Sequence, residues 1–217
     1  METDWKIAAD NARSRSSIYG LIAAIFREEP GEALIRELKA SRLSEVFSSL
    51  GVNLGEEFYN SPEAELADTL GLEFTRLFIG PSNHISAHES VFAELDSGMG
   101  GLWGATTVKV KNFIETAGLD YKAEFTGVPD HVSVEFEFMQ KLTASEADKW
   151  DQQDQQGAEF CQTVQRKFIE EHLVTWIPQF CDAVVTKAEM PFYRAMSELM
   201  KNYLEIEQQG IAAETAA

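Results

Sequence analysis

Apolar residues recur along most of this chain at steps of three or four positions, the spacing that places them on one face of an α-helix. Residues 5–27 carry this pattern, and we expect their helix to end before Pro30. A second apolar stripe has the members Leu66, Leu70, Phe74, Leu77 and Phe78. Ser61 as N-cap and Pro62 as first helical residue predict the start of this helix, and Gly80 predicts its end.

The same spacing of apolar residues predicts the remaining helices. They are expected near residues 32–39, 43–50, 89–95, 105–117, 160–177, 180–187 and from Pro191 onward. Gly118 is expected to cap the helix before it, and Pro178 to separate two of the C-terminal helices. Residues 208–217 are expected to be a frayed tail.

Residues 132–138 permit two interpretations. Apolar and polar side chains alternate strictly there, which is typical of a half-buried strand. Against a strand, Asp130 after Pro129 is a good helix N-cap, and the apolar pattern continues through Leu142, beyond the length of an average strand. We therefore expect a helix.

These elements predict an all-α protein. The 217 residues would form a single globular multi-helix bundle, one all-helical domain over 1–217, with a long central connection over 82–104. That connection is rich in glycine, and it leaves open a sub-boundary within the chain.

Charge and hydropathy restrict the partners and the location. The longest apolar stretch, Ile18–Phe26, is too short to span a bilayer, and the acidic N-terminus is unlike a secretory signal, so we expect a cytoplasmic protein without stable membrane insertion. With 36 acidic and 18 basic residues, the chain has a net charge of −18. Such a surface disfavours nucleic acid and would attract a cationic partner, although acidity can also serve solubility alone.

Motifs for catalysis are weak. There is no Walker A sequence, Gly98-Met99-Gly100 lacks the third glycine of a dinucleotide fingerprint, and the two cysteines form no metal motif. We expect no catalytic residue, no metal and no bound cofactor. One alternative stays open, a small helical metal-binding protein or enzyme, because His84 and His88 at i, i+4 with adjacent Glu89 could ligate zinc.

Three stretches together resemble the TorD-type redox-enzyme maturation chaperones. Phe74, Leu77 and Phe78 match an aromatic-x-x-Leu-Phe signature. Pro129-Asp130-His131 matches a Pro-Asp-His signature, and His172–Phe180 resembles the His-Leu-x-x-Trp-x-Pro-x-Phe segment. The resemblance covers nearly the whole chain. It departs from the family pattern where Val128 replaces a glutamate before Pro-Asp-His and where Ala87-His88-Glu89-Ser90 replaces Pro-aromatic-Glu-Ser.

The resemblance implies an all-helical, non-enzymatic chaperone, a monomer or a domain-exchanged dimer. Such a protein binds the twin-arginine signal peptide and the apo-form of a molybdenum-cofactor oxidoreductase, and assists cofactor insertion before export. A basic and apolar signal peptide would fit a groove with an apolar floor and an acidic rim. The residues assigned to that groove are Phe74, Leu77, Phe78, Gly100, Pro129, Asp130 and His131.

Overall fold

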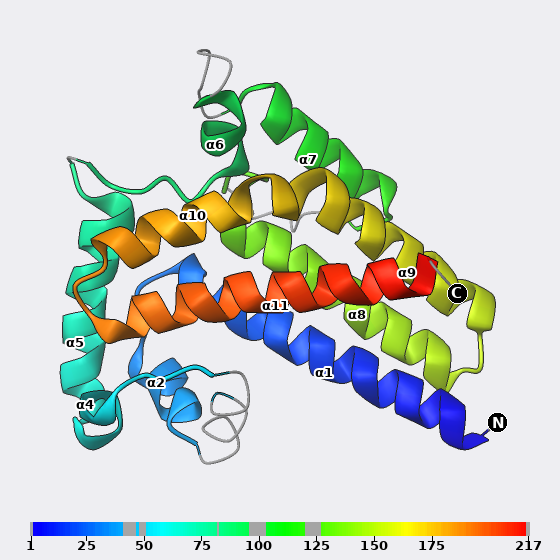
Figure 1. The fold of residues 1–217 in the computed structure, drawn as a ribbon, viewed down its shortest axis with the longest axis horizontal. Helices are drawn as coiled ribbons and strands as arrows, with labels where there is room; N and C mark the ends of the chain where they lie inside the picture. Colours follow the sequence, from blue (N-terminus) through cyan, green and yellow to red (C-terminus); the bar gives the residue numbers. More distant parts are fainter. Residues whose placement is uncertain are drawn as a thin grey trace. The chain divides into compact units, whose positions relative to one another are not determined.

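The computed structural model describes residues 2–40, 47, 51–81, 83–95, 103–119 and 127–215. The described helices are α1 (Glu2–Arg27), α2 (Glu32–Leu38), α4 (Glu56–Asn60), α5 (Glu63–Phe74), α6 (Glu89–Leu95), α7 (Ala105–Thr116), α8 (Val132–Asp151), α9 (Gln155–Phe168), α10 (Val174–Lys187) and α11 (Pro191–Thr215), with π-helical segments η1 (Thr75–Ile79) and η2 (Ile169–Leu173) (Figure 1). Within these ranges no strand is present, and the expected all-α class is confirmed.

The chain folds as two compact units, each built from two separate stretches. The first unit comprises residues 1–27 and 88–176, and the second comprises residues 28–87 and 177–217. The break between Ala87 and His88 lies inside the 82–104 connection, where the sequence left a sub-boundary open. α10 contributes residues to both units.

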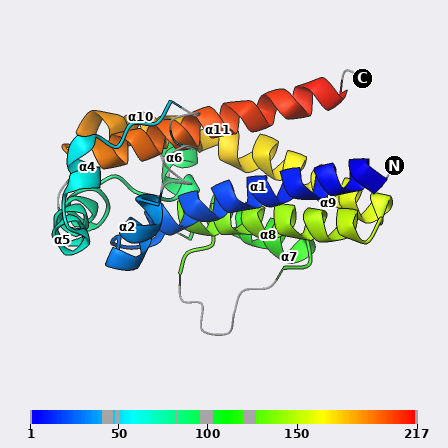
Figure 2. The same ribbon diagram turned by 90° about the horizontal axis from the view of Figure 1, so that it is seen from below.

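In the first unit, α1 and α8 run side by side (Figure 2). Tyr19 of α1 packs its ring 5.8 Å from that of Phe136. Gly20 lies so close to α8 that a Cβ there would collide with the Gln140 side chain. Residues 132–138 therefore form a helix that is covered by neighbours on more than one face. This burial explains why their apolar and polar side chains alternate as they would in a strand.

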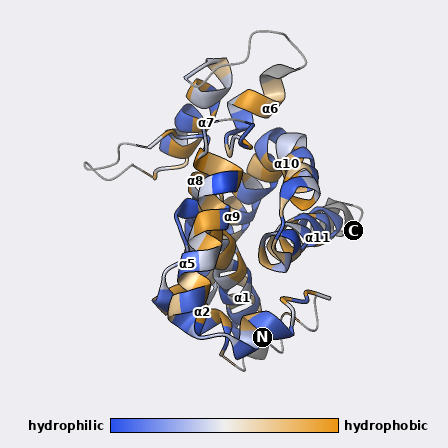
Figure 3. Ribbon diagram, turned by 90° about the vertical axis from the view of Figure 1, so that its left-hand side faces the viewer, coloured by the Kyte–Doolittle hydropathy of each residue, from blue (hydrophilic) through white to orange (hydrophobic). Residues whose placement is uncertain are grey.

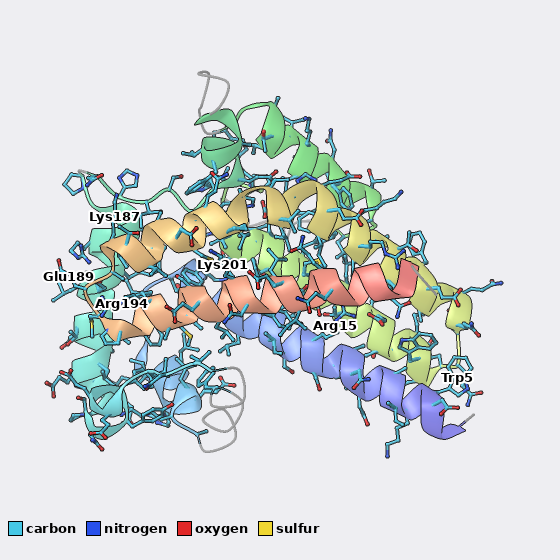
Figure 4. All side chains as sticks on the ribbon, viewed as in Figure 1. Trp5, Arg15, Lys187, Glu189, Arg194 and Lys201 are labelled. Carbon is cyan, nitrogen blue, oxygen red and sulfur yellow. The ribbon has the colours of Figure 1, made fainter. Side chains whose placement is uncertain are left out.

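A buried polar network also ties α1 to α8 and α9. The Arg15 guanidinium (labelled in Figure 4) donates to Glu146 Oε2 at 3.1 Å and to Gln165 Oε1 at 2.7 Å. Gln165 Nε2 donates in turn to Glu146 Oε2 at 2.9 Å. Since each partner is satisfied, the network fixes the register of the three helices without leaving the nearly buried Glu146 carboxylate unpaired.

In the second unit, aromatic rings and one buried carboxylate hold α5 to α11. The Tyr193 hydroxyl donates to the Leu70 carbonyl at 3.2 Å. Glu73 accepts from the backbone N–H of Glu189 at 2.7 Å and from Arg76, and it thereby anchors the turn between α10 and α11, where Figure 4 labels Glu189 and Arg194.

Hydrophobic and hydrophilic residues are interspersed along the helices (Figure 3). Among the described helices, none combines the length and the apolar character that a membrane crossing requires.

Several expected helix ends are wrong. Ser61 ends α4 instead of capping α5, and Pro62 is the N-cap because its carbonyl accepts from Leu66 N–H at 3.1 Å. Pro178 lies inside α10, where it follows the wider turns of η2 that help a helix accommodate a distortion. The helix expected near 43–50 falls mostly outside the described residues. α11 continues to Thr215, into the range 208–217.

Candidate functional site

The site residues expected from the sequence are distributed over both units. Phe74, Leu77 and Phe78 belong to the second unit, whereas the turn formed by Pro129, Asp130 and His131 belongs to the first. Gly100 lies outside the described residues. The two groups are therefore described separately.

The aromatic motif spans the point where α5 becomes η1. Phe74 is 5% exposed, and its ring lies 5.0 Å from that of Phe78 and 6.4 Å from that of Tyr193. Leu77 is buried as well, and its carbonyl accepts from Ile85 N–H at 2.7 Å. Phe78 is only half-buried and stacks 6.0 Å from Phe180. The accessible aromatic surface of this motif thus comes from Phe78.

Sequence reasoning missed two apolar side chains on the outer side of the same segment. Leu72 is 75% exposed and Ile79 is 62% exposed. Neither residue belongs to the apolar stripe that contains Phe74, so the helical periodicity predicted that both side chains face solvent. Their signal in the sequence was an apolar residue at a position predicted to face water.

The Pro-Asp-His turn holds the start of α6. Asp130 is fully buried; its Oδ2 accepts from Ser90 N–H at 2.8 Å, and its carbonyl accepts from Glu89 N–H at 3.0 Å. Asp130 therefore binds the first N–H groups of α6, and the expectation that it caps α8 is wrong. His131 is the N-cap of α8, because its Nδ1 accepts from Ser133 N–H at 3.2 Å. Both helices thus begin at this turn.

Two histidine rings meet at the turn. His88 and His131 pack edge to face with centroids 4.9 Å apart. Burial lowers the pKa of His88, and burial together with the charge of His88 lowers the pKa of His131 to about 4. Both imidazoles are consequently neutral at physiological pH.

The third motif joins the same region through groups that the sequence did not single out. His172 Nδ1 lies 3.0 Å from Glu89 Oε2, and Trp176 Nε1 donates to Glu135 Oε2 at 3.0 Å. Complete burial, reinforced by the nearby Glu89 charge, raises the pKa of Glu135, so that this carboxyl is favoured in its protonated form. The Pro-Asp-His turn and the His172–Trp176 segment therefore share one buried polar network.

The metal-binding alternative finds no matching geometry in the described part of the chain. His84 and His88 lie on an extended stretch and not on one helix face, and Glu89 already contacts His172. No group of three or more His, Cys, Asp or Glu side chains in the described residues is arranged to hold a metal ion.

The described residues define an all-helical protein in which two of the sequence motifs, the Pro-Asp-His turn and the His172–Trp176 segment, share a buried hydrogen-bonded network. A family model described as nitrate reductase delta subunit matches residues 31–182. The chain belongs to this family, that of the TorD-type maturation chaperones.

Curated relatives agree with this assignment. The chain is similar to the chaperone protein TorD of Psychrobacter sp. (strain PRwf-1), with 24% identity over 91% of each chain. It is 26% identical to the TorD chaperone of Aliivibrio fischeri over 67% of this chain and 65% of the relative. It is 30% identical to the perchlorate reductase assembly chaperone protein of Dechloromonas aromatica over 45% of this chain and 43% of the relative. The relatives are named as chaperones, and the protein is a chaperone and not an enzyme.

Proposed function

We propose that the protein is a cytoplasmic chaperone of a molybdenum-cofactor oxidoreductase. It binds the twin-arginine signal peptide of the precursor and the apo-enzyme, and it assists cofactor insertion before export. The observation that carries this proposal is the family match over residues 31–182, together with relatives that are named as TorD and as a reductase assembly chaperone.

The aromatic segment of the second unit supports a peptide-binding role. Half-buried Phe78 and exposed Leu72 and Ile79 offer apolar side chains to a ligand, while Phe74 and Leu77 support them from the core. An apolar stretch of signal peptide could bury part of this surface, which is the main favourable contribution in helix-in-groove recognition.

The acidic character of the chain supports a basic ligand. A net charge of −18 favours encounter with the arginine pair of a signal peptide. At the Pro-Asp-His turn, His131 is half-buried, whereas Asp130 is fully buried. We therefore assign direct contact to His131 and a positioning role to Asp130, whose carboxylate fixes the start of α6. Pro129 and Gly100 complete the proposed peptide-binding set.

The experiment that tests the proposal is recovery of the client from the native cytoplasm. The tagged chaperone is expressed from its own locus, captured gently, and its bound proteins are identified by mass spectrometry. We expect a molybdoenzyme precursor that retains its twin-arginine segment and lacks bound molybdenum. Recovery of mature enzyme only, without the signal segment, would contradict the proposal. A matched capture from cells whose precursor carries Gln-Gln in place of Arg-Arg is the control, and it should recover less precursor.

A further inference from the structure

A groove on the first unit is lined, apart from His172, by residues that have not been considered so far. It runs between α7 and α9 and reaches η2 (both helices are labelled in Figure 1), and it has a volume of about 680 Å³. Its lining includes Lys109, Phe113, Phe160, Lys167, Glu171 and His172. All of these belong to the first unit, so the groove is complete within one compact part of the molecule.

Aromatic side chains form the apolar part of this groove. Phe160 is 63% exposed although it lies on a helix whose other side is buried. Phe113 is half-buried, with its ring 5.2 Å from Phe168 and 5.5 Å from His172. A large aromatic residue left open beside a concave surface is the usual form of an anchor site for a partner side chain.

The cationic groups of the groove face no carboxylate among the described residues that neutralises them. Lys109 of α7 and Lys167 of α9 are exposed, and neither forms an ion pair within the described part of the chain. By contrast, neighbouring Lys111 pairs with Glu115 at 3.6 Å. Both lysines are therefore available to carboxylates of a ligand. The groove is lined by two lysines and one glutamate, Glu171, so its charged side chains are net positive and complement an anionic ligand.

His172 forms the η2 side of the groove and is held in place by Glu89. It is 5% exposed, and its Nδ1 is held by Glu89 at distances of 3.0 and 3.2 Å to the two carboxylate oxygens. The His172 ring lines the groove, and it packs 4.9 Å from the ring of Phe168.

We propose that this groove binds an acidic, apolar segment of the client polypeptide. The inference rests on the proposed chaperone function and adds a second docking site to it. An aromatic or aliphatic side chain of the client packs against Phe113 and Phe160, and flanking carboxylates face Lys109 and Lys167. The basic signal peptide does not fit here, because its arginines would oppose the two lysines. The molecule thus presents separate surfaces to oppositely charged parts of one client.

The test uses two labelled peptides and the full chain. One is a short amidated peptide of Glu and Leu with a central Phe, and the other is a twin-arginine peptide. Both are titrated by fluorescence anisotropy against wild type, the double variant Lys109→Glu/Lys167→Glu and Phe160→Ala. The matched controls are Lys111→Glu, on the same helix but outside the groove, and Val108→Ala, which removes another exposed apolar residue of α7. Circular dichroism and urea melts verify that every variant is folded.

We expect the acidic peptide to bind wild type and to bind about tenfold more weakly to the double variant and to Phe160→Ala. Both control variants should bind the acidic peptide with the affinity of wild type. The twin-arginine peptide should bind wild type and the groove variants with the same affinity. Groove-dependent binding of the acidic peptide together with no binding of the twin-arginine peptide would support the groove and reject the signal-peptide function.

Three results would overturn the groove assignment. They are no binding of the acidic peptide to wild type, equal binding to the double variant, and an equal loss of both peptides in that variant. Sedimentation without peptide provides the last check. A self-associated wild type that becomes monomeric in the groove variants would assign the groove to a second copy of the chain and reject the client segment.

Discussion

Phe74 is a core residue of the second unit by its burial and its ring contacts. It is 5% exposed and packs against Phe78 and Tyr193, while Leu70, one turn earlier, is fully buried. We expect Phe74→Ala to lower the free energy of unfolding by about 3–5 kcal/mol and Leu70→Ala by about 2–5 kcal/mol, because each leaves a cavity. Urea melts measure both values.

Phe78 gives the matched comparison on the same segment. Because its side chain is half-buried, Phe78→Ala should cost less stability than Phe74→Ala while weakening binding of a twin-arginine peptide. If Phe74→Ala were nearly as stable as wild type and lost peptide affinity, Phe74 would line the binding surface directly, and the division between core and contact residues would be wrong.

His131 gives a prediction about acid stability. Its pKa is lowered to about 4 from an ordinary 6.5, first by burial and then by the charge of His88. The folded state therefore binds fewer protons than the unfolded state between these values, so this contribution to stability is lost as the pH falls from about 6.5 to 4.

The variant His131→Asn isolates this effect. Asparagine can still cap α8 through its side-chain oxygen, but it does not titrate. Urea melts at several pH values should show a shallower loss of stability on acidification than in wild type. The residual slope would include His88, whose pKa is lowered in the same direction. An unchanged slope would show that the His131 ring is as easily protonated in the folded state as in the unfolded chain.

At the scale of elements, Glu73 connects η1 with the turn between α10 and α11. Burial raises its pKa, but hydrogen bonds from Arg76 and from the N–H groups of Glu189 and Met190 outweigh burial, and the net pKa is lowered. We expect Glu73→Gln to lower the free energy of unfolding by about 1–3 kcal/mol at pH 7. Since the lowered pKa stabilises only the ionised form, the difference from wild type should shrink as the pH falls below 4.5.

Exposed Glu65 of α5 provides the control. Glu65→Gln removes the same charge from the same helix, and its effect should be within about 0.5 kcal/mol of zero. Comparable losses in both variants would indicate a general charge effect instead of an anchored turn.

Several helices could be predicted from the sequence because their apolar period is local. α5, α6, α7 and α11 begin or end close to the positions that the pattern and the glycines indicated. Helix ends that depend on residues distant in the sequence could not be predicted in this way. Asp130 was assigned to α8 by proximity, but its carboxylate binds the N–H of Ser90, 40 residues earlier. Pro178 lies inside α10, shortly after the π-helical segment η2, whereas the local rule for proline predicted a helix end there.

The candidate site was predictable only in part for the same reason. The motifs located the Pro-Asp-His turn and the aromatic segment. The side chains that support the turn, however, come from distant parts of the sequence: Glu89 contacts His172, 83 residues later, and Glu135 contacts Trp176, 41 residues later. Glu89 and Glu135 are two of 36 acidic residues, so there was no reason in the sequence to single them out. Their roles are visible only from their contacts in the fold.

For the whole molecule, the charge of −18 predicts how a basic ligand associates. The association rate constant of a twin-arginine peptide should fall steadily with salt, because the Debye length shrinks from about 10 Å at 0.1 M to about 3 Å at 1 M. Stopped-flow fluorescence measures this rate constant. An association rate constant that does not change between these salt concentrations would show that electrostatic steering does not contribute to binding.

The central claim is that the protein recognises a twin-arginine signal peptide. Calorimetric titration of the purified chain with such a peptide, and with the same peptide carrying glutamines in place of both arginines, tests this claim most directly. The account predicts saturable binding of the first peptide and affinity at least about tenfold weaker for the second, since both the charge and the hydrogen-bond donors of the guanidinium groups are lost. Equal affinity for both peptides, or no binding of either, would contradict it.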